Sequence, residues 1–370
     1  RGTTFIEGLH IKAESDAKCG EVNMRVSGSD IDSTTLLVAK YKDYGVIVKA
    51  DGDAKELVAG KFETRLDDEA HELQKLVIKE DIAGSWLTNR RTEIEFPSWV
   101  KITHIQEGKR KNISGDVSYT FDKSGNRVEL TFDKDKNSDK AELELTFYVS
   151  VEADATGDIT ARVSGKAIDE EHEIVLGKAI APIEVKTDVK DIKLGVQKQE
   201  LGKLTLTENV AGAFMKSGDV TIALEHDAKW ATEPTVKVVD GEGLRIERVK
   251  TAFNKDNNRE ELTFRVTRES EKPATIEITG MEVNLYRTLP EGEFKVYVGG
   301  GALVRNHNPR YDDYDSKENI TAINRNKPQF KVEWAAEPVV AKVITPADET
   351  TTTKEVVLTI GSTTMFVDGV

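Results

Sequence analysis

Apolar and polar residues alternate along most of this chain. Apolar side chains take every second position in the segments 128–132, 141–151, 261–266, 275–278 and 294–298. A period of two places one face of an extended segment against a hydrophobic core and leaves the other face in water. The pattern therefore predicts many β-strands, each with one buried face.

Short polar clusters separate the predicted strands. Asn, Asp and Gly, which favour tight turns, gather at 123–126, 136–139, 240–243 and 255–258. No segment keeps a helical stripe of apolar residues for more than about two turns, and the best candidate, 66–76, is a charged connector. Short strands joined by such turns predict an all-β chain of tandem Ig-like antiparallel β-sandwich modules with an extended C-terminal strand.

The strand pattern also repeats along the chain. Three segments recur at spacings of 128, 132 and 135 residues, namely 78–86 as 206–214, 121–132 as 253–264, and 157–165 as 292–300. The drift in spacing is small enough to come from loop insertions. A period of this length is too long for a solenoid and fits tandem domains.

A partial copy precedes the two complete ones. Residues 24–28 match 161–165, and 46–49 match 183–186, both at a spacing of 137. Near the other end, 356–360 reads like a first strand such as 76–80 or 204–208. The repeat predicts an N-terminal partial module (1–75), a first repeat (76–203), a second repeat (204–340), a Pro/Thr linker (341–353) and a C-terminal strand (354–370).

Composition argues against several functional classes. The 370 residues carry a net charge of -14, which disfavours nucleic acid as a partner because phosphates demand a basic surface. No run of 18 apolar residues is available to insert into a membrane. The single cysteine, Cys19, is expected to be a buried or inert small apolar residue and leaves no internal disulfide. Arg1 stands where Met would begin a chain, which we interpret as processing such as removal of an export signal.

Catalytic and metal-binding patterns are missing from the sequence. The six histidines are scattered, and none lies two or four positions from another His or a Cys, so we expect surface histidines and no zinc or copper site. We find no Ser-His-Asp order with a recognisable context and no glycine-rich phosphate loop. We therefore predict that the protein is not an enzyme and holds no cofactor, calcium excepted.

An insertion around 305–326 in the second repeat holds the candidate calcium ligands. Its carboxylates are those of Asp312, Asp313, Asp315 and Glu318. Calcium takes several carboxylate oxygens at once, so a loop that gathers these four side chains could hold one ion. A merely solvated acidic loop explains the same residues.

Two further kinds of site are predicted. Tyr311 and Tyr314 lie beside these acids and are candidate surfaces for stacking on sugar rings, since tyrosine presents an apolar face with a polar tip. Asn112 and Asn319 each begin an Asn-X-Ser/Thr sequon and are candidate glycosylation positions. The sequons matter only if the protein is exported.

Ile360-Gly361 and Val367-Asp368-Gly369 give residues 356–370 a resemblance to the opening of the copper amine oxidase N-terminal-like domain. That opening has a strand, an Ile-Gly pair, a spacer and a Val-Asn-Gly-like turn, here with Asp for Asn. The match covers the last fifteen residues, and the proline-rich, arginine-bearing continuation of that domain is missing. The resemblance implies an exported or wall-associated Firmicutes protein with Ig-like repeats and, despite the name, no copper ligands.

The repeat leaves an incomplete module at each end of the sequence, and this predicts how such a protein assembles. Residues 1–75 look like a module that lacks its first strands, and 354–370 look like first strands that lack a module. An incomplete sheet exposes backbone donors and acceptors, which a strand from another molecule can satisfy. We therefore expect a polymeric surface filament or surface layer in which the protein is its own head-to-tail partner. The inward-facing donor residues would be Val356, Leu358, Ile360, Met365 and Val367.

Two alternatives stay open. Residues 356–370 could complete a sheet of their own chain, which would leave a string of β-domains without strand exchange. The protein could instead be a cell-surface adhesin or polysaccharide-binding module that presents the 305–326 insertion, with cell-wall or environmental polysaccharide as its partner. Both the filament and the adhesin predict an extracellular or cell-surface location.

Overall fold

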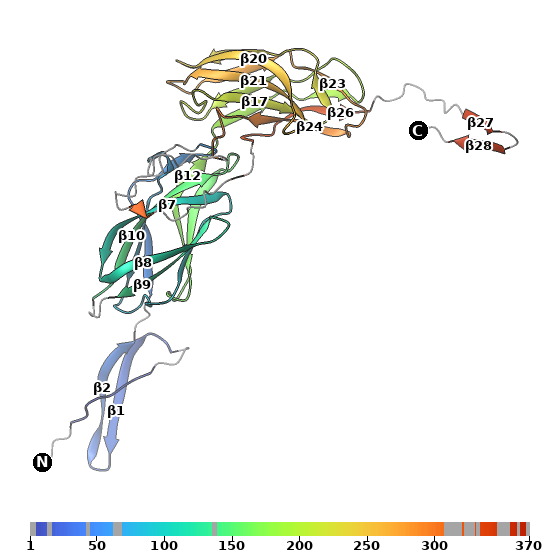
Figure 1. Ribbon diagram of the computed structural model, residues 1–370. Coiled ribbons are helices and arrows are strands. Elements are labelled where there is room, and N and C mark those ends of the chain that lie inside the picture. Colours follow the sequence, from blue (N-terminus) through green and yellow to red (C-terminus); the bar gives the residue numbers. More distant parts are fainter. Residues whose placement is uncertain are drawn as a thin grey trace.

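The structure, a computed structural model, describes residues 5–12, 17–41, 45–61, 69–134, 139–306, 320–321, 330, 334–345, 356–360 and 363–367. Strands dominate these residues, and the one helical element among them is the short 3-10 turn η1, Glu69–His71. The predicted all-β fold is confirmed. Figure 1 shows two β-sandwiches and two separate hairpins, which we name the N-terminal hairpin (β1, Gly20–Gly28; β2, Ile31–Tyr41) and the C-terminal hairpin (β27, Val356–Ile360; β28, Thr363–Val367).

The first sandwich contains a five-stranded and a six-stranded sheet, in the orders β25-β7-β10-β5-β3 and β4-β12-β11-β6-β9-β8. Its strands are β3 (Val46–Asp51), β4 (Glu56–Val58), β5 (Lys75–Glu80), β6 (Thr92–Glu95), β7 (Val100–Lys111), β8 (Ile113–Phe121), β9 (Arg127–Lys134), β10 (Glu142–Val151), β11 (Gly157–Ser164), β12 (His172–Ile180) and β25 (Ile320–Thr321). Trp86, Phe96 and Phe147 are among its largest fully buried side chains. The rings of Phe96 and Phe147 meet edge to face at 5.1 Å between centroids.

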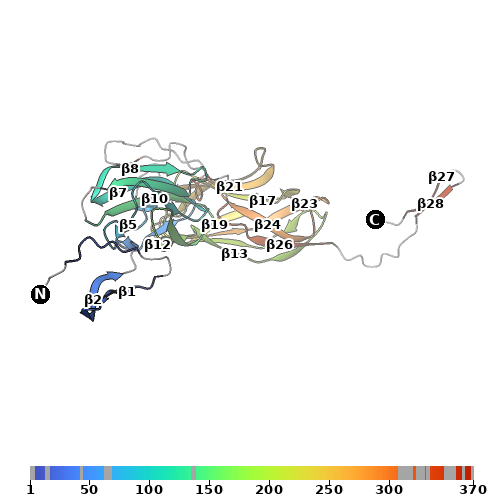
Figure 2. The same ribbon diagram turned by 90° about the horizontal axis from the view of Figure 1, so that it is seen from below.

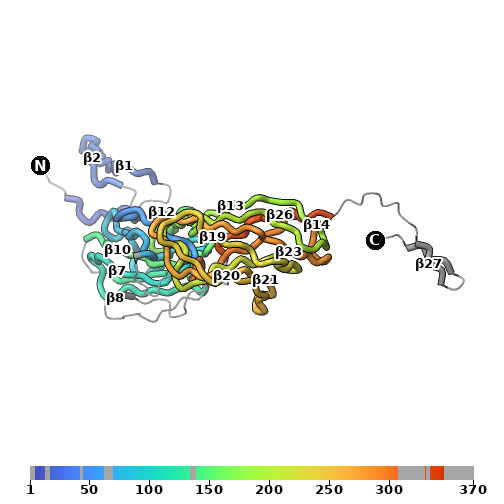
Figure 3. Tube along the Cα trace, turned by 90° about the horizontal axis from the view of Figure 1, so that it is seen from above, coloured from blue at the N-terminus to red at the C-terminus, as the bar shows by residue number. Residues whose placement is uncertain are grey.

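The second sandwich repeats this plan with sheets β13-β16-β22-β19 and β14-β26-β24-β17-β21-β20, plus a small sheet β15-β23-β18. Its strands are β13 (Ile183–Thr187), β14 (Lys190–Lys193), β15 (Gln199–Glu200), β16 (Leu204–Glu208), β17 (Asp219–Leu224), β18 (Ala228–Trp230), β19 (Thr235–Asp240), β20 (Arg245–Asn254), β21 (Arg259–Arg268), β22 (Thr275–Thr279), β23 (Glu282–Leu285), β24 (Gly292–Gly299) and β26 (Val339–Ile344). Figure 3 shows β14 running beside β26, with which it pairs in parallel.

The predicted alternation is visible in the burial of the strands. In β16, Leu204, Leu206 and Glu208 are buried while Thr205 and Thr207 are half-buried, and β22 alternates in the same way. The predicted turn clusters 123–126, 240–243 and 255–258 lie between β8 and β9, β19 and β20, and β20 and β21. Period two therefore located the strands, and the polar clusters located the turns.

Each sandwich takes its outermost strand from the segment just before it. β3 pairs antiparallel with β5, and β13 pairs antiparallel with β16, so the two pairings are equivalent. The repeat-based boundaries place these segments differently, with 46–51 in the N-terminal module and 183–187 in the first repeat. The hydrophobic cores follow the strand pairing, because Val46 and Val48 belong to the first core and Ile183 belongs to the second.

A buried glutamate ends the first repeated strand of each sandwich. Glu80 accepts hydrogen bonds from the backbone N–H groups of Gly84 (2.8 Å), Trp86 (3.1 Å) and Ala141 (2.8 Å). Glu208 likewise accepts from the backbone of Phe214 and Ala274, both at 2.8 Å, and from the Ser270 hydroxyl. These bonds explain why 78–86 recurs as 206–214, since the acid and the loop that donates to it are one local unit.

The two sandwiches are joined by direct hydrogen bonds. The backbone N–H of Arg305 donates to the carbonyl of Gly60 (2.8 Å), and the buried Asn306 side chain donates to the carbonyl of Val151. Gly60 has φ 72°, and a Cβ there would lie 2.9 Å from the Ala153 Cβ. Further along the chain, β25 pairs with β7, so the insertion of the second repeat extends a sheet of the first sandwich.

Candidate functional site

The N-terminal hairpin is a structural copy of β11 and β12 that lacks a sandwich around it. β1 pairs with β2 in a register interrupted by a bulge at Val38, and β11 pairs with β12 in a register with the same bulge at Leu176. Gly20 pairs with Tyr41 as Gly157 pairs with Ala179. A shared bulge is a strong sign of equivalence, because it fixes which face each side chain occupies.

The face that β11 and β12 bury is exposed in the N-terminal hairpin. Leu176 is fully buried in the first core, whereas its equivalent Val38 is 38% exposed. Ile159, Ala161 and Val163 of β11 are also fully buried, and their equivalents Val22, Met24 and Val26 are only half-buried. Figures 1 and 2 show β1 and β2 as a hairpin of their own, and they belong to neither sheet of the first sandwich. We call the residues Val22, Met24, Val26, Leu36 and Val38 the uncovered face.

Leu37 of β2 lies on the face of the hairpin opposite the uncovered face. Leu37 is 52% exposed, and its equivalent Val175 in β12 is 46% exposed although it lies within a complete sandwich. Leu37 therefore occupies a position that faces solvent in both settings. The exposure of Val38 is different, because the first sandwich buries that position completely.

The C-terminal hairpin contains all the predicted donor residues. Val356 pairs with Val367, Leu358 with Met365, and Ile360 with Thr363, in one antiparallel ladder. Within the described residues, β27 and β28 thus pair with each other and with no strand of the sandwiches. Pairing of these residues with another molecule stays a prediction.

The repeat in the sequence matches 356–360 to the strands 76–80 and 204–208. The structure instead matches the C-terminal hairpin to the two strands that open each sandwich. Each sandwich opens with a strand, a short turn and a second short strand that ends two residues before a glycine, Gly60 or Gly195, with φ 72° or 70°. The backbone N–H after each glycine, of Lys61 or Val196, donates to the carbonyl of the last residue of the strand, Val58 or Lys193. β27 and β28, followed by Gly369 in the sequence, have the same order of two strands and a glycine, so this segment matches β3–β4 and β13–β14 more closely than 76–80.

Most predicted ligand residues lie outside the described residues. These are Asp312, Asp313, Asp315, Glu318, Tyr311, Tyr314 and Asn319. Calcium binding and sugar binding by the insertion therefore stay predictions. Asn112 is described at the turn between β7 and β8, where it has φ 52° and its amide donates to the carbonyl of Lys140 at 2.7 Å. The described residues contain no group of three His, Cys, Asp or Glu side chains suited to a metal ion.

Cys19 was expected to be buried or inert, and it is not buried, because it precedes the N-terminal hairpin and not a sandwich core. The expectation of surface histidines was wrong for two residues. His71 and His104 are buried at 2% and 0% exposure, so they are not surface histidines. The ring of His104 packs 5.4 Å from that of Tyr148, between centroids, on strands β7 and β10.

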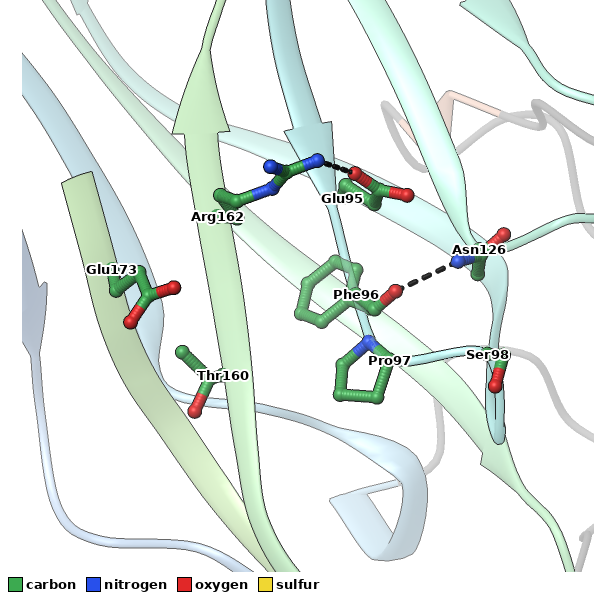
Figure 4. Close-up of a pocket in the computed structure, with 8 residues that line it drawn as sticks. All are labelled: Glu95, Phe96, Pro97, Ser98, Asn126, Thr160, Arg162 and Glu173. Atoms are coloured by element: carbon green, nitrogen blue, oxygen red, sulfur yellow. Dashed lines mark hydrogen bonds and ion pairs between the residues drawn. The ribbon is translucent and has the colours of Figure 1, made fainter. Parts of the chain in front are cut away.

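A shallow pocket of about 380 Å³ lies on the six-stranded sheet of the first sandwich. Figure 4 shows Arg162 between strands β6 and β12, paired with Glu95, while Asn126 donates to the carbonyl of Phe96 at 2.7 Å. Arg162 also pairs with Glu171 at 3.4 Å. The hydrogen bond that Arg162 donates to Glu95, and then the nearby charge of Glu171, raise the pKa of Arg162. These polar groups satisfy one another, so the pocket fits a cross-strand ion-pair cluster better than a ligand site.

Comparison with known proteins leaves the family open. No protein-family model and no curated protein matches the chain, so the resemblance to the copper amine oxidase N-terminal-like domain is not supported. Similar solved structures include the C-terminal domain of the antigen I/II polypeptide BspA of Streptococcus agalactiae, at 12% identity over 70% of this chain and 96% of that chain, with a TM-score of 0.27.

Two others are the collagen adhesin CNA of S. aureus, at 10% identity over 70% of this chain and 86% of that chain with a TM-score of 0.21, and BcpA, the major pilin subunit of Bacillus cereus. BcpA is 13% identical over 75% of this chain and 66% of that chain, with a TM-score of 0.28. These TM-scores carry no functional conclusion. No helix in the described part of the chain is long and apolar enough to cross a membrane.

Proposed function

We propose that this protein is an extracellular, cell-surface structural subunit that assembles into a filament or surface layer by exchanging β-strands between copies. The observation that carries the proposal is the uncovered face of the N-terminal hairpin. Its bulge position, Val38, is 38% exposed, whereas the equivalent Leu176 is buried in a sandwich. Apolar residues patterned for a core, but without one, favour association with another surface.

Backbone hydrogen bonding supports the same proposal. Strand β2 pairs with β1 on one side, while its equivalent β12 pairs with β11 on one side and with β4 on the other. An edge of β2 thus lacks the partner that β12 has among the described strands. An added strand would satisfy the backbone groups of this edge and cover apolar side chains at the same time.

The C-terminal hairpin supplies a suitable strand. It is a two-stranded sheet on its own, and an isolated hairpin is at best marginally stable in water. Opening it therefore costs little compared with the pairing that a sheet edge offers. Exchange between the two ends of different copies is heterologous, so the contact extends into fibres or sheets unless a rotation closes it.

Deleting residues 354–370 tests the proposal. The truncated protein is expected to remain folded, because β27 and β28 pair with no described strand of either sandwich, and to lose assembly in negative-stain micrographs and light scattering. A variant in which 354–370 keeps its composition in scrambled order is the matched control for length and charge, and it should also fail to assemble. A truncated protein that still polymerises would refute the donor role.

A further inference from the structure

Each sandwich contains the contact that the N-terminal hairpin lacks among the described strands. In the first sandwich, β4 lies parallel to β12, with Leu57 beside Ala179. In the second, β14 lies parallel to β26, with Ile192 beside Val343. Leu57 and Ile192 each stand three residues before the turn glycine, Gly60 or Gly195. The opening strands and the closing strands of a sandwich therefore meet in one fixed register.

Both halves of this contact recur in the terminal hairpins. Tyr41 is the equivalent of Ala179, because each pairs with the glycine that begins the preceding strand. Phe366 stands three residues before Gly369, as Leu57 stands before Gly60. Among the described strands, the N-terminal hairpin is thus a closing pair that no opening strand joins, and the C-terminal hairpin is an opening pair that no closing strand joins.

We propose that β28 of one copy pairs in parallel with β2 of a second copy, with Phe366 beside Tyr41. The proposal rests on the proposed function and specifies its register and strand polarity. This contact assigns the edge pairing to β28 and not to β27. The distinction matters because β4, and not β3, is the opening strand that pairs with β12.

Strand β27 then takes a second role in the same contact. In the first sandwich β3 belongs to the sheet opposite β12 and makes tertiary contact with it. Val46 and Val48 of β3 are part of the core that buries Leu176. By the same placement, β27 would cross the uncovered face of the N-terminal hairpin. The segment Val356–Ile360 is apolar at four of its five positions, as a cover for such a face requires.

A second copy is the occupant that this geometry favours. Both complementary halves are present in each copy of this chain, and among the described strands the C-terminal hairpin pairs with no strand of either sandwich. Docking requires the ladder between β27 and β28 to open, because β3 and β4 lie in different sheets once they are in place. A hairpin of five residue pairs that packs on no third strand opens readily.

Cysteine cross-linking between two differently tagged proteins tests the register. Cys19→Ser removes the exposed native thiol from both proteins. One then carries Tyr41→Cys and the other Phe366→Cys, so that a disulfide between the two can form only between different molecules. Thr35→Cys, on the same hairpin and more exposed than Tyr41, is the matched control. After mixing and mild oxidation, the 41–366 disulfide should form about tenfold faster than the 35–366 disulfide.

The outcomes separate this inference from the proposed function. Filaments in micrographs together with equal cross-linking at positions 35 and 41 would overturn the register and leave strand exchange standing. Protein that stays monomeric at every concentration and forms no selective disulfide would overturn both. A selective disulfide found with assembled protein supports both, and mass spectrometry of the linked peptides identifies the two positions.

Discussion

Glu80 and Glu208 lie 128 residues apart and occupy the same place in the two sandwiches, each at the end of a strand and each at most 2% exposed. Both carboxylates accept backbone N–H groups from the loop that follows and from a residue much further along the chain. A carboxylate has two oxygens that accept hydrogen bonds and none that donates. The repeated acid therefore joins three backbone segments at each site.

Glu208→Gln should destabilise the second sandwich by about 2–3 kcal/mol. The amide keeps the shape of the side chain but replaces one accepting oxygen with a donating NH₂ group, so a buried N–H of Phe214 or Ala274 loses its acceptor. Urea unfolding measures the loss, and amide hydrogen exchange locates it. Glu277→Gln, on the exposed pair with Lys203, is the control and should change stability by less than about 0.5 kcal/mol. Equal effects from the two substitutions would contradict the role of Glu208.

Gly165→Ala and Gly28→Ala should differ in effect although the two glycines occupy equivalent positions, Gly28 as the last residue of β1 and Gly165 just after β11. Gly165 has φ 115°, and a Cβ there would lie 2.4 Å from the carbonyl oxygen of Arg91, so alanine should cost about 2–4 kcal/mol. A Cβ at Gly28 would meet only the Ile31 side chain, at 4.0 Å. Gly28→Ala should therefore leave the unfolding of both sandwiches unchanged. Thermal unfolding followed by circular dichroism checks both, and a large loss from Gly28→Ala would show that strands pack around the N-terminal hairpin.

Local pattern was sufficient to predict the strands and turns, because period two and turn chemistry are properties of neighbouring residues. Sheet membership was not predictable in this way. The alternation in 46–51 is the same whether β3 closes one module or opens the next, and only the pairing of Val46 with Glu80 decides it. The pairing of Ile320 with Gln106 likewise joins segments more than 200 residues apart, for which the sequence holds no local signal.

The sequence also did not predict which single polar residues are buried. His104 lies in a strand whose outer face would ordinarily be solvated, so nothing in its neighbours indicated full burial. The sequence did not indicate the uncovered face, because the match over 24–28 covers β1 but not β2. The bulge shared by Val38 and Leu176 is visible only in the strand pairing of the structure. The position of 354–370 in the repeat predicted the donor residues. Their match to the two strands that open each sandwich depends on Gly60 and Gly195, whose conformations only the structure gives.

The stability contributed by Tyr119 should disappear at alkaline pH. Its hydroxyl donates to Glu107 Oε1 at 2.6 Å, and burial, followed by this hydrogen bond, raises the pKa of Tyr119 well above its usual value. The unfolded chain therefore loses this proton first as the pH rises through about 10. Below that pH the contribution is complete, and above it the contribution falls by about 1.4 kcal/mol per pH unit until the folded group also ionises.

The comparison protein for this prediction is Tyr119→Phe, which has no proton to lose. Its unfolding free energy at pH 8 should lie about 1–2 kcal/mol below that of the wild type, and the gap should close between pH 10 and 11. Urea titrations across this range measure the gap, and the difference between the two proteins cancels the other tyrosines. A gap that stays constant with pH would contradict the raised pKa.

Val38→Lys should prevent self-assembly, whereas Leu37→Lys should not. Val38 occupies the position that a sandwich buries completely, as Leu176 shows, so a lysine there would bring a charge into the contact. Leu37 corresponds to Val175, which is 46% exposed even in the first sandwich. Both substitutions add the same charge to the same strand and remove a similar apolar area, so net charge and solubility change equally. Light scattering as a function of protein concentration measures assembly, and circular dichroism verifies that both sandwiches stay folded. Loss of assembly in both variants would point to charge rather than to the uncovered face, and retention in both would mean that this face takes no part.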